Sequence, residues 1–194
     1  MRRRTLDLIA SAGGFVLTIV LLVAGSLAMW GYTFANNSVH DQLAVQKIFV
    51  PPKGSEALAS PEIGPYLNSY AGQQVTNGAQ AEAYADHFIA VHLKEIGGGQ
   101  TYSELSAKAL ANPNDQELAG KVQTMFRGET LRGLLLNAYA FWKVGQIALV
   151  ASIVSFALAG VMLILSILGI VHLRRTGPEE EFGAARRRAA TVTG

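Results

Sequence analysis

Two long runs without charged residues constrain this chain more than any other feature. No Asp, Glu, Lys or Arg occurs between Asp7 and Asp41, and none occurs between Lys143 and Arg174. About 20 apolar residues in a helix cross the hydrocarbon core of a bilayer. The sequence therefore predicts two transmembrane helices, over residues 8–32 and 144–172. Only 15% of all residues are charged, whereas a soluble domain carries about a quarter.

Arginines at both ends of the chain predict its orientation. Arg2, Arg3 and Arg4 precede the first run, and an arginine pair at 174–175 and a triplet at 186–188 follow the second. By the positive-inside rule both termini stay in the cytoplasm. We therefore expect a plasma-membrane protein with hairpin topology. Its parts are a cytoplasmic start at 1–7, an extracytoplasmic domain at 33–143 and a disordered cytoplasmic tail at 173–194.

A cleaved signal peptide is the alternative interpretation of the first run. Arginines, an apolar segment and the small residues around Ser26 and Ala28 resemble a signal sequence with a cleavage site. The apolar run is long for a signal sequence, which favours a membrane span. Cleavage would leave the protein anchored by its second span alone.

Aromatic residues mark the outer ends of both runs. Trp30 and Tyr32 lie at the outer end of the predicted helix over 8–32, and Tyr139 and Trp142 precede the second run. Tryptophan and tyrosine are enriched where a membrane meets water, because their rings are apolar and carry a polar tip. We expect these four residues to be interfacial anchors.

The segment between the runs has the signals of helices and lacks a convincing alternation of strand residues. Apolar residues recur with helical spacing over 79–96, and three glycines at 97–99 end that helix. Thr101 and Glu104 form a capping box, and Asp115 caps a further helix. No strong breaker separates Glu129 from the second run, which predicts one long helix entering the membrane. The predicted fold is an all-α membrane protein with a helical domain inserted between two spans.

Two sets of residues are candidates for packing and interaction. The helix over 79–96 is amphipathic and needs a partner for the apolar face that carries Phe88 and His92. Glu95 lies one turn from His92, and a buried pair of this kind senses pH; a structural histidine in a core or interface is the alternative. In the second span Ala151, Ser155 and Ala159 repeat every four residues, a spacing that lets helices approach closely in lipid.

The residues exclude several classes of chemistry. The chain has no cysteine, which excludes thiolate metal sites and cysteine nucleophiles. It has no HExxH, GxSxG or phosphate-loop motif. His87 and His92 lie about 140° apart on a helix, so they do not suit one metal ion. A net charge of +2 gives no reason to expect a nucleic-acid partner. We predict no enzyme activity, no catalytic or metal-binding residues and no cofactor.

Three segments carry a resemblance to a known group of proteins. These are WGYTFANNSVHDQL after the first run, IFVPPKG, and FRGETLRGLLLNAYAFW before the second run. In this arrangement the chain resembles actinobacterial two-span membrane proteins of unknown function, some of which are described as aromatic ring-opening dioxygenases. Such an enzyme binds iron through histidines and a carboxylate. The spacing of His87 and His92 does not provide that set, so the activity is not carried over.

The predicted function follows from the lack of a catalytic motif, from the small-residue repeat in the second span and from the amphipathic helix over 79–96. We expect a non-enzymatic accessory, scaffold or assembly subunit of a larger membrane complex. Its expected partners are the lipid bilayer and other membrane subunits or a second copy of itself. The alternative is an extracytoplasmic sensor or small-ligand-binding module held by two spans.

Overall fold

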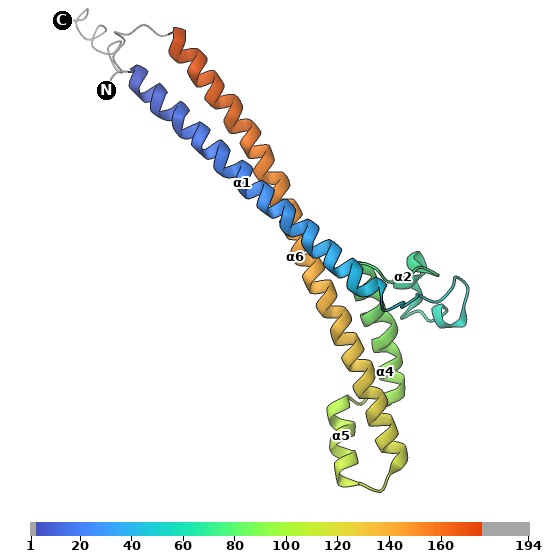
Figure 1. Cartoon of the computed structure of the whole chain (residues 1–194). Coiled ribbons are helices and arrows are strands. Elements are labelled where there is room, and N and C mark those ends of the chain that lie inside the picture. Colours follow the sequence, from blue (N-terminus) through green and yellow to red (C-terminus); the bar gives the residue numbers. More distant parts are fainter. Residues whose placement is uncertain (1–2, 176–194) are drawn as a thin grey trace, which may run out of the picture. The chain divides into compact units, whose positions relative to one another are not determined.

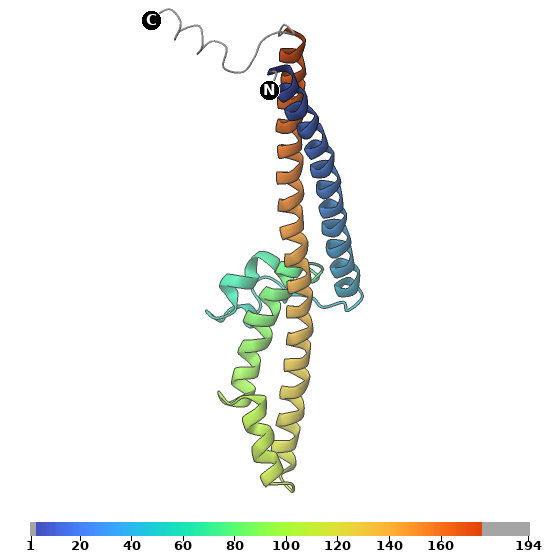
Figure 2. The ribbon, with the colours of Figure 1, turned by 90° about the vertical axis from the view of Figure 1, so that its left-hand side faces the viewer.

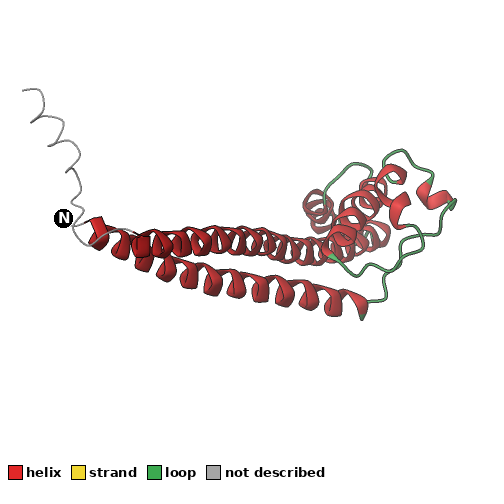
Figure 3. Cartoon of the chain, turned by 90° about the horizontal axis from the view of Figure 1, so that it is seen from above, coloured by secondary structure: helices red, strands yellow, loops and turns green. Residues whose placement is uncertain are grey.

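The computed structural model describes residues 3–175, without the side chains of residues 3, 4 and 6. Within this range the chain is all-helical, as predicted, and contains no strand (Figure 3). Phe49 and Gln74 form an isolated antiparallel bridge. The predicted tail at 173–194 lies outside the described residues from 176 onward.

Two long helices dominate the chain, α1 (Arg3–Ala44) and α6 (Gln116–Arg175). Between them lie two short 3₁₀ helices, η1 (Glu56–Leu58) and η2 (Asn68–Tyr70), one π-helical segment, η3 (Ala85–Ile89), and four α-helices. These four are α2 (Gly64–Leu67), α3 (Gly78–Tyr84), α4 (Ala90–Gly97) and α5 (Tyr102–Ala111) (Figure 1).

Both long helices are long and apolar enough to cross a membrane. In their most apolar stretches only 22% of α1 and 11% of α6 is buried within the protein. The core helix of a soluble protein is mostly buried, so these values agree better with helices whose outer faces contact lipid. Both helices exceed the predicted spans. The helix α6 continues without a break from Gln116 to Arg175, because single glycines do not end a helix whose other residues favour it.

The chain divides into two compact units. The first, here called the two-helix unit, consists of Met1–Gly31 and Ala148–Gly194; the second, the central unit, is Tyr32–Ile147. In the two-helix unit the apolar parts of α1 and α6 pack along each other (Figures 1 and 2). In the central unit α3, η3 and α4 lie beside the first half of α6 (Figure 2).

Polar caps define where the helices of the central unit begin. The Asn77 side chain accepts a hydrogen bond from the Gln80 amide at the start of α3. The predicted capping box is present, because Thr101 Oγ1 accepts from the Glu104 amide and Glu104 accepts from the Thr101 amide. Asp115 caps α6 through the Leu118 amide at 2.9 Å. Each cap satisfies backbone groups that the first turn of a helix leaves without partners.

Two turns end helices by other means. Gly98 and Gly99 adopt positive φ angles of 59° and 78° after α4, a conformation that glycine reaches at no steric cost. At the end of α1 the Gln74 side chain donates to the Ala44 carbonyl at 2.6 Å. This bond ties the loop after α1 to the segment that precedes α3.

The core of the central unit is apolar and draws on every helix from α1 to α6. Leu67 and Val75 are fully buried, and Val50, Leu93 and Met125 are at most 5% exposed. The loop residues Ile48 and Val50 are joined to the segment before α3 by backbone bonds, in which the Val75 amide donates to the Ile48 carbonyl at 2.9 Å. Burial of loop residues explains how a segment rich in proline and glycine is held in place.

Candidate interaction surfaces

A seam of small and hydroxyl-bearing residues joins α1 and α6 in the two-helix unit. These residues are buried between the helices, although the rest of each helix is largely exposed. They are Ser11, Gly14, Thr18 and Gly25 on α1, and Ser152, Ala159 and Ser166 on α6. The α6 residues repeat every seven positions, which keeps one face toward the partner when two helices coil gently around each other.

The contacts across this seam are close. Ser152 Oγ donates to the Gly25 carbonyl at 2.8 Å, a hydrogen bond between residues far apart in the sequence. A methyl group on Gly14 would overlap the Ser166 hydroxyl, and one on Gly169 would overlap the Ser11 hydroxyl. Glycine on one helix therefore faces serine on the other in both pairs, and the two backbones approach as closely as in small-residue membrane packing.

The small residues singled out in the second span take different positions around α6. Ala159 is only 1% exposed and lies in the seam. Ser155 is half-buried and donates to the carbonyl of Ala151, which is itself exposed. A four-residue repeat advances by about 40° at each step on a helix with 3.6 residues per turn. Of the three residues, Ala159 is the one that the contact between α1 and α6 buries.

The outer faces of the same helices are apolar and exposed. On α1 they include Ile9, Val16, Ile19 and Val23, and on α6 they include Val150, Ile153, Val161 and Leu168. Each of these side chains is more than half exposed. Exposed apolar surface on this scale is unusual for a soluble monomer and is typical of a surface that contacts lipid or protein.

The four predicted anchors have unlike surroundings. Trp30 is 67% exposed, whereas Tyr32, Tyr139 and Trp142 are half-buried. Tyr139 and Trp142 are stacked with ring centroids 6.2 Å apart. Trp142 also packs on the central core and covers Gly78, where a methyl group would overlap its side chain. Trp142 therefore takes part in the packing of the central unit.

The aromatic face predicted over 79–96 is real, but its geometry is not that of a regular α-helix. The rings of Tyr84, Phe88 and His92 follow one another with centroids 4.8 and 4.4 Å apart. His92 Nδ1 lies 2.7 Å from the Phe88 carbonyl. Glu95 is exposed, and within residues 3–175 no ion pair joins it to His92. The structure thus places Phe88 and His92 together and leaves Glu95 apart.

The π-helical segment η3 changes which residues face α6. A π-helical turn holds more residues than an α-helical turn, so it rotates the residues that follow. Within η3, the Asp86 side chain contacts Arg132 of α6. The His87 ring stacks on the ring of the exposed Tyr66, with centroids 3.4 Å apart and an interplanar angle of 2°. A helical wheel assumes unbroken α-helical geometry, so it does not reveal these contacts of Asp86 and His87.

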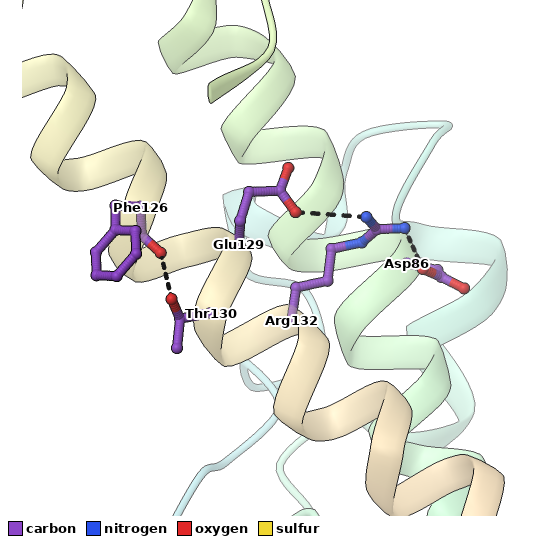
Figure 4. Close-up of polar contacts among 5 residues, drawn as sticks. All are labelled: Asp86, Phe126, Glu129, Thr130 and Arg132. Atoms are coloured by element: carbon purple, nitrogen blue, oxygen red, sulfur yellow. Dashed lines mark hydrogen bonds and ion pairs between the residues drawn. The ribbon is translucent and has the colours of Figure 1, made fainter. Parts of the chain in front are cut away.

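Arg132 is the residue of the central unit that sequence reasoning missed. Its Nη2 donates to Asp86 Oδ1 at 2.8 Å, and its Nη1 lies 3.5 Å from Glu129 Oε2 (Figure 4). Its Nε is buried and has no hydrogen-bond partner. The signal in the sequence is its position among the leucines of the segment that forms α6, which indicates a partly buried site. Arginine is almost never buried unless it is paired, so an acidic partner is expected there.

Three groups in the central unit have shifted pKa values. The hydrogen bond to Asp86 raises the pKa of Arg132, which keeps the guanidinium charged. The hydrogen bond from the Thr101 backbone lowers the pKa of Glu104, with a second contribution from the Thr101 hydroxyl. Burial raises the pKa of Tyr84 by disfavouring the phenolate. The three shifts favour a charged Arg132, a charged Glu104 and a neutral Tyr84.

A groove of about 410 Å³ lies between the end of α1 and the middle of α6 in the central unit. We call it the α1–α6 groove. Its lining residues are Val39, Gln42, Leu43, Gln46, Ile48, Leu131, Leu134, Leu135, Asn137, Ala138 and Phe141. Its lining contains none of the aromatic row of Tyr84, Phe88 and His92.

The described part of the chain shows no group of three or more His, Cys, Asp or Glu side chains placed to hold a metal ion. The His87 ring stacks on Tyr66, and the His92 ring contacts Phe88.

Comparison of the chain with protein-family models, with curated proteins and with solved structures gives no match.

Proposed function

We propose that the protein is an integral membrane accessory subunit that assembles with other membrane proteins or with itself. In this proposal α1 and α6 each cross the plasma membrane, both termini lie in the cytoplasm, and the central unit lies outside. The observation that carries it is the exposed apolar outer surface of both helices. Lipid and neighbouring membrane helices are the environments that make such a surface favourable.

The small-residue seam supports an assembly role for the outer faces. Ser11, Gly14 and Gly25 are already occupied by contacts with α6. A partner helix would therefore contact the larger side chains on the outer faces, and a partner protein would contact exposed apolar residues of the central unit. Leu110 at the end of α5 is 82% exposed, and Phe126 is 49% exposed.

The test is the size of the complex formed by the full chain. Membranes that contain the tagged protein are solubilised in mild detergent and separated by size, and proteins that co-purify are quantified. We expect the protein in a complex larger than the monomer, with a second chain or a second copy in fixed proportion. A monomer without such a chain would contradict an assembly role.

A matched pair of variants tests the central unit as a contact surface. Leu110→Asp removes the most exposed large apolar side chain of α5 and adds a charge, and should reduce the larger species. Ala107→Asp adds the same charge to another exposed position of α5 and should leave the complex intact. Equal effects would show that added charge, rather than loss of Leu110, is responsible.

Binding of a small ligand is the second candidate function. The α1–α6 groove favours it, because its volume of about 410 Å³ falls within the roughly 300–1,000 Å³ of small-molecule sites. A sensor or ligand site built around His92 receives less support than the groove, because the His92 ring already contacts the Phe88 carbonyl and ring.

A further inference from the structure

The chemistry of the α1–α6 groove restricts what it can bind. Its walls are the aliphatic and aromatic side chains named above, and none of its lining residues is charged. The polar side chains that line it are three carboxamides, those of Gln42, Gln46 and Asn137. A carboxamide both donates and accepts hydrogen bonds. The groove is therefore suited to an apolar chain that carries an uncharged polar group, such as an ester.

Size separates a small molecule from a protein segment. Stable protein interfaces bury roughly 1,200–2,000 Å² over broad surfaces. The groove has instead the volume of a small-molecule site and lies between two helices, where such sites are common. One flexible hydrocarbon chain is the occupant that combines this size with an apolar lining.

The position of the groove in the chain indicates where that hydrocarbon comes from. Most of its lining residues lie on α1 and α6, the same helices that carry the two candidate membrane spans, and Gln46 and Ile48 lie in the loop directly after α1. On α6, exposed apolar side chains continue from Leu134 through Phe141, Val144 and Ile147, which are 42–64% exposed. The helix is unbroken over this stretch. A hydrocarbon chain that follows α6 out of a bilayer thus remains in contact with apolar side chains.

We propose that the α1–α6 groove binds one acyl chain of a membrane lipid, with the lipid's ester group at the carboxamides. This inference rests on the proposed membrane anchoring, because anchoring supplies the lipid. Burial of the acyl chain would also cover Leu131 and Leu134, which are 39% and 64% exposed without it. The gain comes from removing apolar surface from water.

The test uses the full chain in vesicles of phosphatidylcholine, a fraction of which carries a photoreactive diazirine in the middle of one acyl chain. Light attaches the lipid to nearby residues, and mass spectrometry of the digested protein locates the attachment. Ala138→Trp fills the groove, since Ala138 is half-buried and lines it. Ala140→Trp is the matched control, because Ala140 is exposed on the same helix and does not line the groove.

We expect attachment at 131–141 in the wild type and in Ala140→Trp, and a loss of about tenfold or more there in Ala138→Trp, as expected when buried apolar contacts are displaced. Attachment within the spans should remain in all three proteins.

Span attachment without attachment at 131–141, or an equal yield there in Ala138→Trp, would overturn the inference. A lack of attachment in the spans, with release of the protein by alkaline carbonate, would overturn the proposed anchoring instead. Links at 131–141 to another protein chain would make the groove a protein-binding site and would also overturn the inference.

Discussion

At the scale of single residues, Arg132 holds the central unit together through charge. It links α6 to η3 through Asp86 and also contacts Glu129 on its own helix. About one third of its side chain is exposed, as is about one third of that of Asp86. Solvent therefore screens the pair in part, and its contribution is smaller than that of a fully buried pair.

Replacing Arg132 with alanine should lower the free energy of unfolding by about 1 kcal/mol, because a charged hydrogen bond is lost at a partly exposed site. Thermal unfolding of the full chain in detergent, followed by circular dichroism, measures the change. Arg127→Ala, at an exposed position of α6, is the control. If Arg132→Ala costs as much in an Asp86→Asn background as alone, the pair with Asp86 is not the source of the effect.

The capping box of α5 should make that helix sensitive to acid. The folded pKa of Glu104 is lowered from 4.5, first by the Thr101 backbone bond. A lowered folded pKa contributes stability that is complete above the unfolded value and is lost as the pH falls through the folded pKa. Protection of the Thr101 and Glu104 amides from hydrogen exchange should therefore exceed that in Glu104→Gln at pH 6. The difference should shrink below pH 4.5, and the exposed Glu95→Gln should show no such change. A constant difference across this range would exclude the carboxylate as its origin.

At the scale of elements, α6 is one uninterrupted helix that contributes to both the central unit and the two-helix unit. Its 60 residues give a length of about 90 Å at 1.5 Å per residue, about three times the hydrocarbon core of a bilayer. Its first part packs on α4 and α5, and its later part packs on α1. The glycines of α6 therefore have different roles according to what each one faces.

A pair of glycines in α6 tests this distinction. A methyl group on Gly128 would overlap the Leu93 side chain of α4, whereas one on Gly133 would meet nothing within 4 Å. Gly128→Ala should destabilise the protein by about 1–3 kcal/mol through overpacking. Gly133→Ala should stabilise it by up to about 1 kcal/mol through helix propensity. The thermal unfolding midpoints of the two variants and the wild type measure these changes. Stabilisation by both substitutions would mean that α4 does not pack on Gly128 in solution.

At the scale of the whole molecule, the central question is which parts lie on which side of the membrane. The natural chain has no cysteine, so single cysteines report their own positions without background. The arginine-rich flanks predict cytoplasmic termini, and α1 and α6 are long and apolar enough for two crossings. Together these features predict that residues 33–143 lie outside.

Single cysteines at Lys53, in the central unit, and at Thr191, in the tail, should differ in reactivity. In intact cells or spheroplasts a membrane-impermeant maleimide should label Lys53→Cys and leave Thr191→Cys unlabelled. After the membrane is permeabilised both variants should react, which is the control for accessibility. Labelling of Thr191→Cys before permeabilisation would contradict the proposed orientation, and so would protection of Lys53→Cys.

The sequence alone predicted the elements whose signals are local. The two apolar helices follow from long runs without charge, and the cap at Thr101 and the start of α6 after Asp115 follow from side chains that bond to nearby amides. Such features depend on neighbours within a few residues, and helix periodicity is therefore sufficient to find them.

Tertiary structure decided which residues meet across the chain. The pairs Gly14 with Ser166, Gly25 with Ser152 and Arg132 with Asp86 join positions far apart in the sequence. Their partners depend on helix register, on the π-helical turn of η3 and on the close packing of α1 with α6. A periodicity of four or seven residues identifies a face of a helix, but packing alone selects what covers that face.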